Sequence, residues 1–210
     1  MNQENNRVVC DKGSPQGEPE YFLTERFGRA LAMACDVHRG HFRKGTAIPY
    51  VSHLLAVAGI VLEHGGSEDE AIAALLHDSV EDRGGEKLLS EIEARFGKPV
   101  ADIVVGCSDT LDPKNKPEWR ERKERYLAHL AKAPGSVRLV SAADKLHNAR
   151  SIVADHRQIG DRLWTRFNAE KTLQRWYYRS LADVFRDTGT CPPLVEEVER
   201  AVNELSLCVG

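Results

Sequence analysis

The chain has 210 residues, of which 41% are hydrophobic, and its formal net charge at pH 7 is −3. This length and apolar content are sufficient for one substantial core without division into two domains. The slightly negative charge disfavours general attraction to nucleic acid, and no apolar run approaches the roughly 20 residues that a membrane span requires, so we expect neither partner.

Residues 1–18 are polar and rich in Gly, Pro and Asn, which predicts a disordered N-terminal segment followed by a single globular domain over 19–210. From there helical periodicity dominates, and no convincing strand alternation occurs. Gly and Pro pairs divide the helices. We therefore predict an all-α bundle of about nine to ten helices, with helices over residues 24–39, 51–64, 68–82, 86–96, 98–107, 117–132, 135–155, 168–187 and 193–207.

A histidine and an aspartate, His77-Asp78, end the apolar run 71–76, and His53 and Asp144 also stand in apolar helical stretches. Two imidazoles and two carboxylates could together ligate one divalent metal ion through nitrogen and oxygen. Such an ion activates water and neutralises charge on a phosphoryl group, so phosphate-ester hydrolysis is its natural use. At this point the alternative is four unrelated residues, namely a buried histidine, a surface histidine and two capping aspartates.

The acidic pair Glu81-Asp82 follows the His77-Asp78 dyad closely. On a regular α-helix these four side chains fall within an arc of about 140°. Gly84-Gly85 is a stop signal, which places the acids in the last helical turn, where the helix dipole disfavours negative charge. An isolated pair of this kind would be a solvated helix end, but its position beside the dyad indicates a functional role.

Five sequence blocks occur in a characteristic order: residues 34–44 (ACDVHRGHFRK), 49–53 (PYVSH), 73–82 (AALLHDSVED), 96–97 (FG) and 143–148 (ADKLHN). The chain thereby resembles the small alarmone hydrolases and the hydrolase half of the bifunctional RelA/SpoT proteins, within the HD phosphohydrolase superfamily. The resemblance spans about residues 24–185 and implies an HD-type helical fold.

The resemblance implies a metal-dependent (p)ppGpp 3′-pyrophosphohydrolase of the stringent response. It places a single Mn²⁺, or another divalent ion, on the four residues of the quartet. Glu81 and Asp82 then assist the attack of water on the 3′ phosphate. The sequence does not assign separate roles to these two acids. The 3′ pyrophosphoryl group leaves whole, and GDP or GTP remains.

Residues for the substrate are also implied by the resemblance. Arg43 and Lys44 match the family's basic pair at the nucleotide site, and a guanidinium beside an ammonium suits a polyphosphate. Asn148 is one helical turn after Asp144 and faces the same way, whereas Lys145 lies about 100° around the helix. Aromatic residues at helical spacing usually belong to the core. Among the aromatic residues after the metal motifs, we predict a substrate contact only for Tyr177.

Two departures from the family pattern concern the substrate more than the reaction. The family's glutamine is His41 here, and the proline that often follows the first metal histidine is Leu54. Neither change removes a predicted ligand. The sequence therefore defines the reaction class better than it defines the nucleobase of the substrate. Two alternatives stay open: hydrolysis of another nucleotide (ppApp, NADPH or a nucleoside monophosphate), or a non-catalytic nucleotide-binding protein. The intact acidic pair at 81–82 argues against a protein that only binds.

Charges alternate in sign along residues 118–125, with Glu118, Arg120, Glu121, Arg122, Lys123, Glu124 and Arg125. This pattern is typical of a solvated helix with ion pairs along its surface, which we prefer to a nucleotide-binding patch.

Five cysteines without CxxC spacing fit reduced thiols, and the N-terminal segment lacks the apolar centre of a signal peptide. We therefore predict a cytoplasmic protein. The chain ends too soon to hold the synthetase domain of the bifunctional relatives, so we expect hydrolysis without synthesis, with functional pairing to a separate alarmone synthetase as a further possibility.

Overall fold

The computed structural model describes residues 23–109 and 117–209, without the side chain of Asp82. The segment predicted to be disordered, 1–18, lies outside these ranges. Within them the chain forms nine α-helices and no β-strand, which confirms the all-α prediction. The α-helices are α1 (Glu25–Val37), α2 (Val51–Glu63), α3 (Glu68–Leu76), α4 (Gly85–Phe96), α5 (Lys98–Cys107), α6 (Trp119–Leu130), α7 (Gly135–Ile159), α8 (Lys171–Asp187) and α9 (Pro192–Val209).

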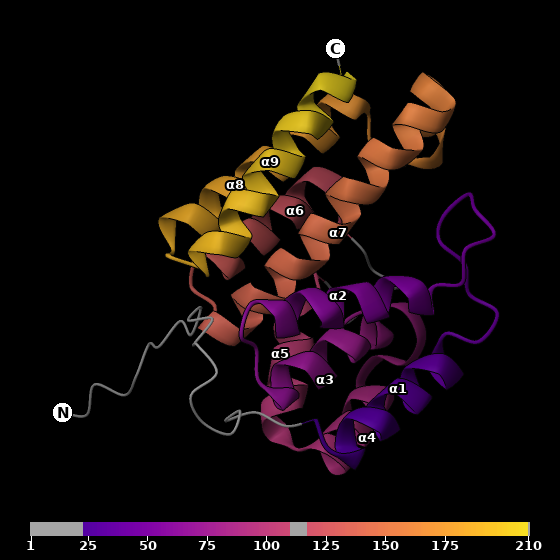
Figure 1. Cartoon of the computed structure of the whole chain (residues 1–210), viewed down its shortest axis with the longest axis vertical. Coiled ribbons are helices and arrows are strands. Elements are labelled where there is room, and N and C mark those ends of the chain that lie inside the picture. The colour runs from indigo at the N-terminus through magenta and orange to yellow at the C-terminus, as the bar shows by residue number, and fades with distance from the viewer. Residues whose placement is uncertain (1–22, 110–116, 210) are drawn as a thin grey trace.

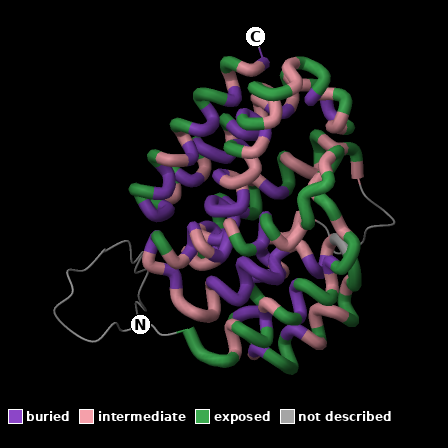
Figure 2. The backbone as a smooth tube through the Cα atoms, turned by 45° about the vertical axis from the view of Figure 1, so that its right-hand side comes forward, coloured by how far each residue is buried: buried purple, intermediate pink, exposed green. Residues whose placement is uncertain are grey.

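The longest helix, α7, connects the two ends of the molecule. Helices α1 to α5 gather at one end and α8 and α9 at the other, while α7 crosses between them (Figure 1). It packs against α2, α3 and α5 on one side and against α8 and α9 on the other. Buried residues line the inner faces of the helices in both parts (Figure 2), and they form one continuous apolar core. Residues projecting from α7 therefore face an interior built by both ends of the bundle.

Helix α3 begins at a capping box and is buried along its whole apolar part. The Ser67 hydroxyl accepts the backbone N–H of Glu70, and the Glu70 carboxylate accepts the backbone N–H of Ser67 at 2.7 Å. Every residue from 71 to 76 is buried. This reciprocal cap satisfies N–H groups that have no partner inside the helix, so it fixes where the helix begins.

The predicted helix over 68–82 is wrong at its end. The α-helix stops at Leu76, and η1 (Val80–Gly84) is a π-helical turn that leads directly into α4. The backbone N–H of Gly85 closes this turn by donating to the carbonyl of Val80. The acidic pair therefore lies in a wide π turn, a feature frequent at functional sites, and not in the last turn of a regular helix.

A second difference concerns the segment between α7 and α8. Helix α7 continues to Ile159, and a 3₁₀ segment, η2 (Gly160–Arg166), follows before α8 begins at Lys171. Gly160 adopts φ +59°, a left-handed conformation that glycine takes without strain, and it ends the helix. The segment η2 then packs against α7.

Helix α6 follows the surface prediction only in part. Arg120 pairs with Glu124 and Arg125 with Glu121, on the exposed side. Arg122 and Lys123 instead point inward, with side chains 15% and 16% exposed.

The described cysteines are not all reduced as predicted. Cys35, Cys107 and Cys208 are free thiols, whereas Cys191 is disulfide-bonded. In the part of the chain that the structure describes, no helix has the length and apolar character needed to span a membrane.

Candidate metal centre and adjoining cavity

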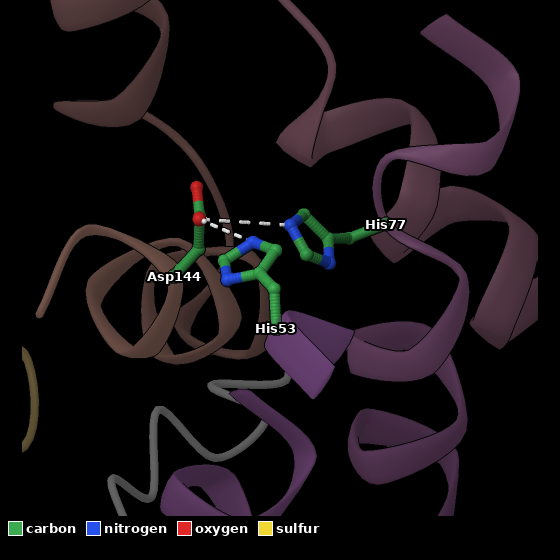
Figure 3. A group of neighbouring side chains, drawn as sticks. All are labelled: His53, His77 and Asp144. Carbon is green, nitrogen blue, oxygen red and sulfur yellow. Dashed lines mark ion pairs between the residues drawn. The ribbon is translucent and has the colours of Figure 1, made fainter. Parts of the chain in front are cut away.

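Three buried side chains from three helical segments meet between α2, α3 and α7. His53 projects from α2, His77 from the end of α3 and Asp144 from α7 (Figure 3). Their ligand atoms all lie within 4.8 Å of one another. Asp144 Oδ1 is 3.2 Å from His53 Nε2 and 3.7 Å from His77 Nε2. The structure thus brings these three predicted ligands together, and their role as ligands stays a prediction.

Asp78 stands at the open side of this group. Its Oδ2 is 3.1 Å from His77 Nε2 and 3.5 Å from His53 Nε2, and it accepts the Tyr50 hydroxyl at 2.6 Å. The Asp78 side chain is 26% exposed, whereas that of Asp144 is 6% exposed. The Asp78 carboxylate therefore faces both imidazoles at distances similar to those of Asp144, so the structure brings all four predicted ligands together.

The two imidazoles are oriented as metal ligands require. His77 Nδ1 lies 2.8 Å from the carbonyl of Ala74, so Nδ1 donates there and Nε2 is the nitrogen that presents a lone pair once the ring is neutral. His53 Nδ1 lies 2.8 Å from His147 Nδ1. Both Nε2 atoms are buried without a hydrogen-bond partner among the described residues. Unpartnered buried nitrogens beside two carboxylates fit a divalent cation, which would satisfy all of them together.

Electrostatic interactions inside this group are strong. Burial acts to lower the pKa of His77, but the Asp78 and Asp144 carboxylates outweigh it and hold that pKa well above its usual range. Burial acts to raise the pKa of both carboxyls, but His77 beside Asp78, and Lys145 and the histidines beside Asp144, hold them well below their usual range. Both carboxylates are therefore ionised and ready to bind a cation.

Metal binding is expected to release a proton and to tighten as the pH rises. Without metal the pKa of His77 is raised, so the ring is protonated near neutral pH, and it must become neutral to bind a cation. The affinity should therefore increase by up to about tenfold per pH unit below that pKa. Titration calorimetry with Mn²⁺ in two buffers of different ionisation enthalpy measures the proton release. His156→Gln, at a partly buried histidine outside the centre, should release the same number of protons. A wild type that releases none would contradict this prediction.

Glu81, on the π turn, is held by an ion cluster that the sequence did not reveal. The backbone N–H of Asp109 donates to Glu81 Oε2 at 3.3 Å. The Asp109 carboxylate in turn accepts from Arg122 and from Lys123 Nζ. The Asp109 side chain is 6% exposed. This contact joins η1, the end of α5 and α6, and no local sequence signal marks it. Of Asp82, only the backbone in η1 is described.

A cavity of about 510 Å³ adjoins the metal centre. Arg43, Lys44 and Asn148, which the resemblance implied as substrate residues, line this cavity, and their contact with substrate stays a prediction. Tyr178 also lines it, whereas the predicted Tyr177 does not. Tyr177 instead contacts Lys123, whose Nζ is 4.9 Å from the ring centroid.

Asn148 connects this cavity to the metal centre. Its Oδ1 accepts from Arg43 Nη2 at 2.7 Å, and its Nδ2 donates to Asp144 Oδ1. The predicted Lys145 does not line the cavity but pairs with Asp144 Oδ2. One amide therefore orients a cavity arginine and a predicted metal ligand at once.

His41, the departure from the family pattern, stacks on Tyr50 with ring centroids 4.1 Å apart. His38 continues the stack, 4.9 Å from Tyr50. Since Tyr50 donates to Asp78, the stack fixes the outer carboxylate of the centre. Sequence reasoning missed Tyr50, His38 and His147 as supporting residues, although all three stand in or beside the blocks that carried the resemblance.

Comparison with protein families matches residues 30–171 to the HD domain. The chain belongs to the HD domain family. This family implies a divalent metal, for which His53, His77 and Asp144 form a candidate site. That the ion is Mn²⁺ stays a prediction.

Curated HD domain relatives are named for alarmone hydrolysis. The chain is 38% identical to guanosine-3′,5′-bis(diphosphate) 3′-pyrophosphohydrolase MESH1 of Xenopus tropicalis over 126 residues, covering 59% of this chain and 67% of that protein. It is 34% identical to the bifunctional (p)ppGpp synthase/hydrolase SpoT of Escherichia coli K12 over 130 residues. That match spans 61% of this chain but only 18% of SpoT.

Solved HD domain structures share the fold. One, described as a metazoan ortholog of SpoT that hydrolyzes ppGpp, superimposes with a TM-score of 0.70 at 26% identity, covering 87% of this chain and 96% of that one. Another, lmo0812 from Listeria monocytogenes EGD-e, gives a TM-score of 0.61 at 30% identity over 71% of this chain and 96% of that one.

Proposed function

We propose that this HD domain protein is a metal-dependent (p)ppGpp 3′-pyrophosphohydrolase, which uses water to give GDP or GTP and pyrophosphate. The observation that carries the proposal is the link through Asn148 between the His53, His77 and Asp144 centre and a basic cavity. Similarity to relatives named for this activity supports it.

The cavity residues suit a polyphosphorylated nucleoside. Arg43 and Lys44 supply positive charge, and the guanidinium of Arg43 lies 5.8 Å from the centroid of the Tyr50 ring. Asn148 holds Arg43 toward the centre, so a phosphate bound by Arg43 would be directed to the same place. The basic pair therefore orients the substrate with its 3′ phosphates toward Asp78 and Asp144.

His53, His77, Asp78 and Asp144 would hold Mn²⁺. When bound, a divalent ion of this kind lowers the pKa of a water molecule and neutralises charge on the phosphoryl group. His77 is kept in the required tautomer by the Ala74 carbonyl, and Asp78 is held by Tyr50. These contacts supply orientation that a bare cluster of ligands would lack.

Glu81, with Asp82 beside it, would serve as the general acid and base. A carboxylate in this position orients the attacking water and takes its proton, and it can return a proton to the departing 3′ oxygen. The Asp109 N–H donates to Glu81 Oε2 and so helps to hold this carboxylate in place on the π turn.

The domain would occupy residues 19–210, act in the cytoplasm, and work opposite a separate alarmone synthetase. Its substrate would be a small nucleotide and not a nucleic acid, in agreement with a net charge of −3.

The test is release of pyrophosphate from ppGpp by the purified protein with Mn²⁺, measured beside ppApp, NADPH and nucleoside monophosphates. We expect turnover of ppGpp, with GDP as the other product, and its loss when the metal is chelated. Turnover of another panel member alone would keep a metal hydrolase but replace the substrate. Bound metal with no turnover of any compound would refute the proposed activity.

A further inference from the structure

The cavity beside the metal centre has two chemically different ends. Arg43 and Asn148 lie at the end joined to Asp144. Asp155 lies eleven residues after Asp144 on α7, which is about 16 Å along the helix axis at 1.5 Å per residue. Besides its partner Arg166, the cavity lining on α7 and the segment after it includes the apolar and aromatic side chains of Ile152, Leu163 and Phe167. A carboxylate in that setting requires a reason, because a polyanionic substrate is repelled by it.

This inference rests on the proposed function, which fixes the orientation of the substrate. If the 3′ phosphates lie at the metal centre, the nucleoside extends away from it along α7. The base then reaches the apolar end, where its faces can pack on Leu163 and Phe167 and its edge meets Asp155.

Asp155 is held in place by contacts from another segment. Arg166, at the end of η2, donates from Nη1 to Asp155 Oδ2 at 2.8 Å, and the two side chains are 22% and 32% exposed. The stem of Arg166 lies against Gly45, where an added Cβ would be 2.6 Å from Arg166 Nε. Gly45 also has φ +71°, a conformation that L side chains rarely adopt. The loop that carries Arg43 and Lys44 therefore packs closely on the arginine that fixes Asp155.

We propose that Asp155 selects guanine over adenine in this cavity. Guanine presents two adjacent donors on one edge, the N1–H and the 2-amino group, and a carboxylate accepts both. Adenine presents an acceptor at N1, which leaves a carboxylate without its hydrogen bond and faces it with a lone pair. A polar site that loses its partner in this way discriminates far more strongly than an apolar wall.

The experiment compares kcat/KM for the 3′,5′-bis(diphosphates) of guanosine, inosine and adenosine in wild type and in Asp155→Asn. Inosine keeps the N1–H but lacks the 2-amino group, so it probes half of the contact. The wild type should prefer the guanosine compound to the inosine compound by about tenfold and to the adenosine compound by more. Asp155→Asn should lower kcat/KM for the guanosine compound by about tenfold or more, and change that for the adenosine compound by less than about threefold.

The matched control is Asp161→Asn. Asp161 is an exposed aspartate on η2, the segment that also carries Arg166, and it pairs with Lys171 outside the cavity. It should leave all three values unchanged, and thermal unfolding checks that both variants are folded. An Asp155→Asn variant that lowers all three values equally would make the Asp155–Arg166 pair a purely structural contact and overturn the inference, as would one that changes none.

Equilibrium binding of the same three compounds separates this inference from the proposed activity. Preferential binding of the guanosine compound that Asp155→Asn abolishes supports guanine selection even if wild type turns over nothing, in which case only the proposed activity fails. Binding without any preference overturns guanine selection.

Discussion

His77→Asn is expected to lose the divalent metal and to lower the rate of ppGpp hydrolysis by at least about a thousandfold, because the metal contributes several kcal/mol to the transition state. The asparagine amide can still donate to the Ala74 carbonyl, as His77 Nδ1 does, so the end of α3 keeps its hydrogen bond. What the variant removes is the Nε2 atom that faces Asp78 and Asp144. Metal content, pyrophosphate release and thermal unfolding, measured on one preparation, separate these effects.

His64→Asn is the matched control for this change. His64 is also buried at a helix end, and its Nδ1 lies 2.8 Å from the carbonyl of Ile60, but it is outside the metal centre. The control should retain metal and activity while losing a similar amount of buried imidazole. A His77→Asn protein that still binds one metal ion at wild-type affinity would show that the ion is held elsewhere.

The helical architecture was predictable because each helix carries its own local signals. Apolar periodicity and Gly or Pro punctuation located all nine α-helices in the described ranges, and several boundaries agree within a few residues. The π turn at η1 was not predictable in this way. The π turn is accompanied by tertiary contacts: Val80 is fully buried, and Ser79 Oγ lies 3.4 Å from His38 Nε2. Because Ser79 and His38 are 41 positions apart, their contact leaves no local pattern in the sequence.

The candidate centre was predictable for a related reason. Twenty-four residues separate His53 from His77 and sixty-seven separate His77 from Asp144, yet each interrupts an apolar helical stretch, where a polar side chain requires a partner. The supporting contacts lacked such a signal. Asp109 follows α5 in an ordinary polar stretch, and its partners on α6 are part of a pattern that looks entirely exposed. Only the packing of α6 against its neighbours distinguishes Lys123 from Arg125.

The same limit applies to the cavity. Of the residues predicted to contact substrate, Arg43, Lys44 and Asn148 line the cavity, whereas Tyr177 does not and its neighbour Tyr178 does. The side chains of adjacent residues on a helix point about 100° apart, so a prediction that is wrong by one position names a side chain that points away from the cavity.

Glu81→Gln is expected to lower kcat for ppGpp by about 10²- to 10⁴-fold, the usual loss when a positioned acid or base is removed. The metal should stay bound, because Glu81 is not among the ligand atoms that converge on His53. Glutamine keeps an oxygen that can accept the Asp109 N–H, so the side chain should keep its position, and KM should change little. The measurement is kcat and KM across pH, where the variant should also lose the limb of the profile that reports the carboxyl group.

Glu86→Gln, an exposed residue in the first turn of α4, is the control for loss of a negative charge near the π turn, and it should leave kcat unchanged. Asp82→Asn completes the comparison, because the two acids are adjacent in η1 and only one needs to exchange protons with the reacting water. If Glu81→Gln retains wild-type kcat while Asp82→Asn loses it, the proton-transfer role belongs to Asp82, and the Asp109 contact holds Glu81 as a structural residue of the turn.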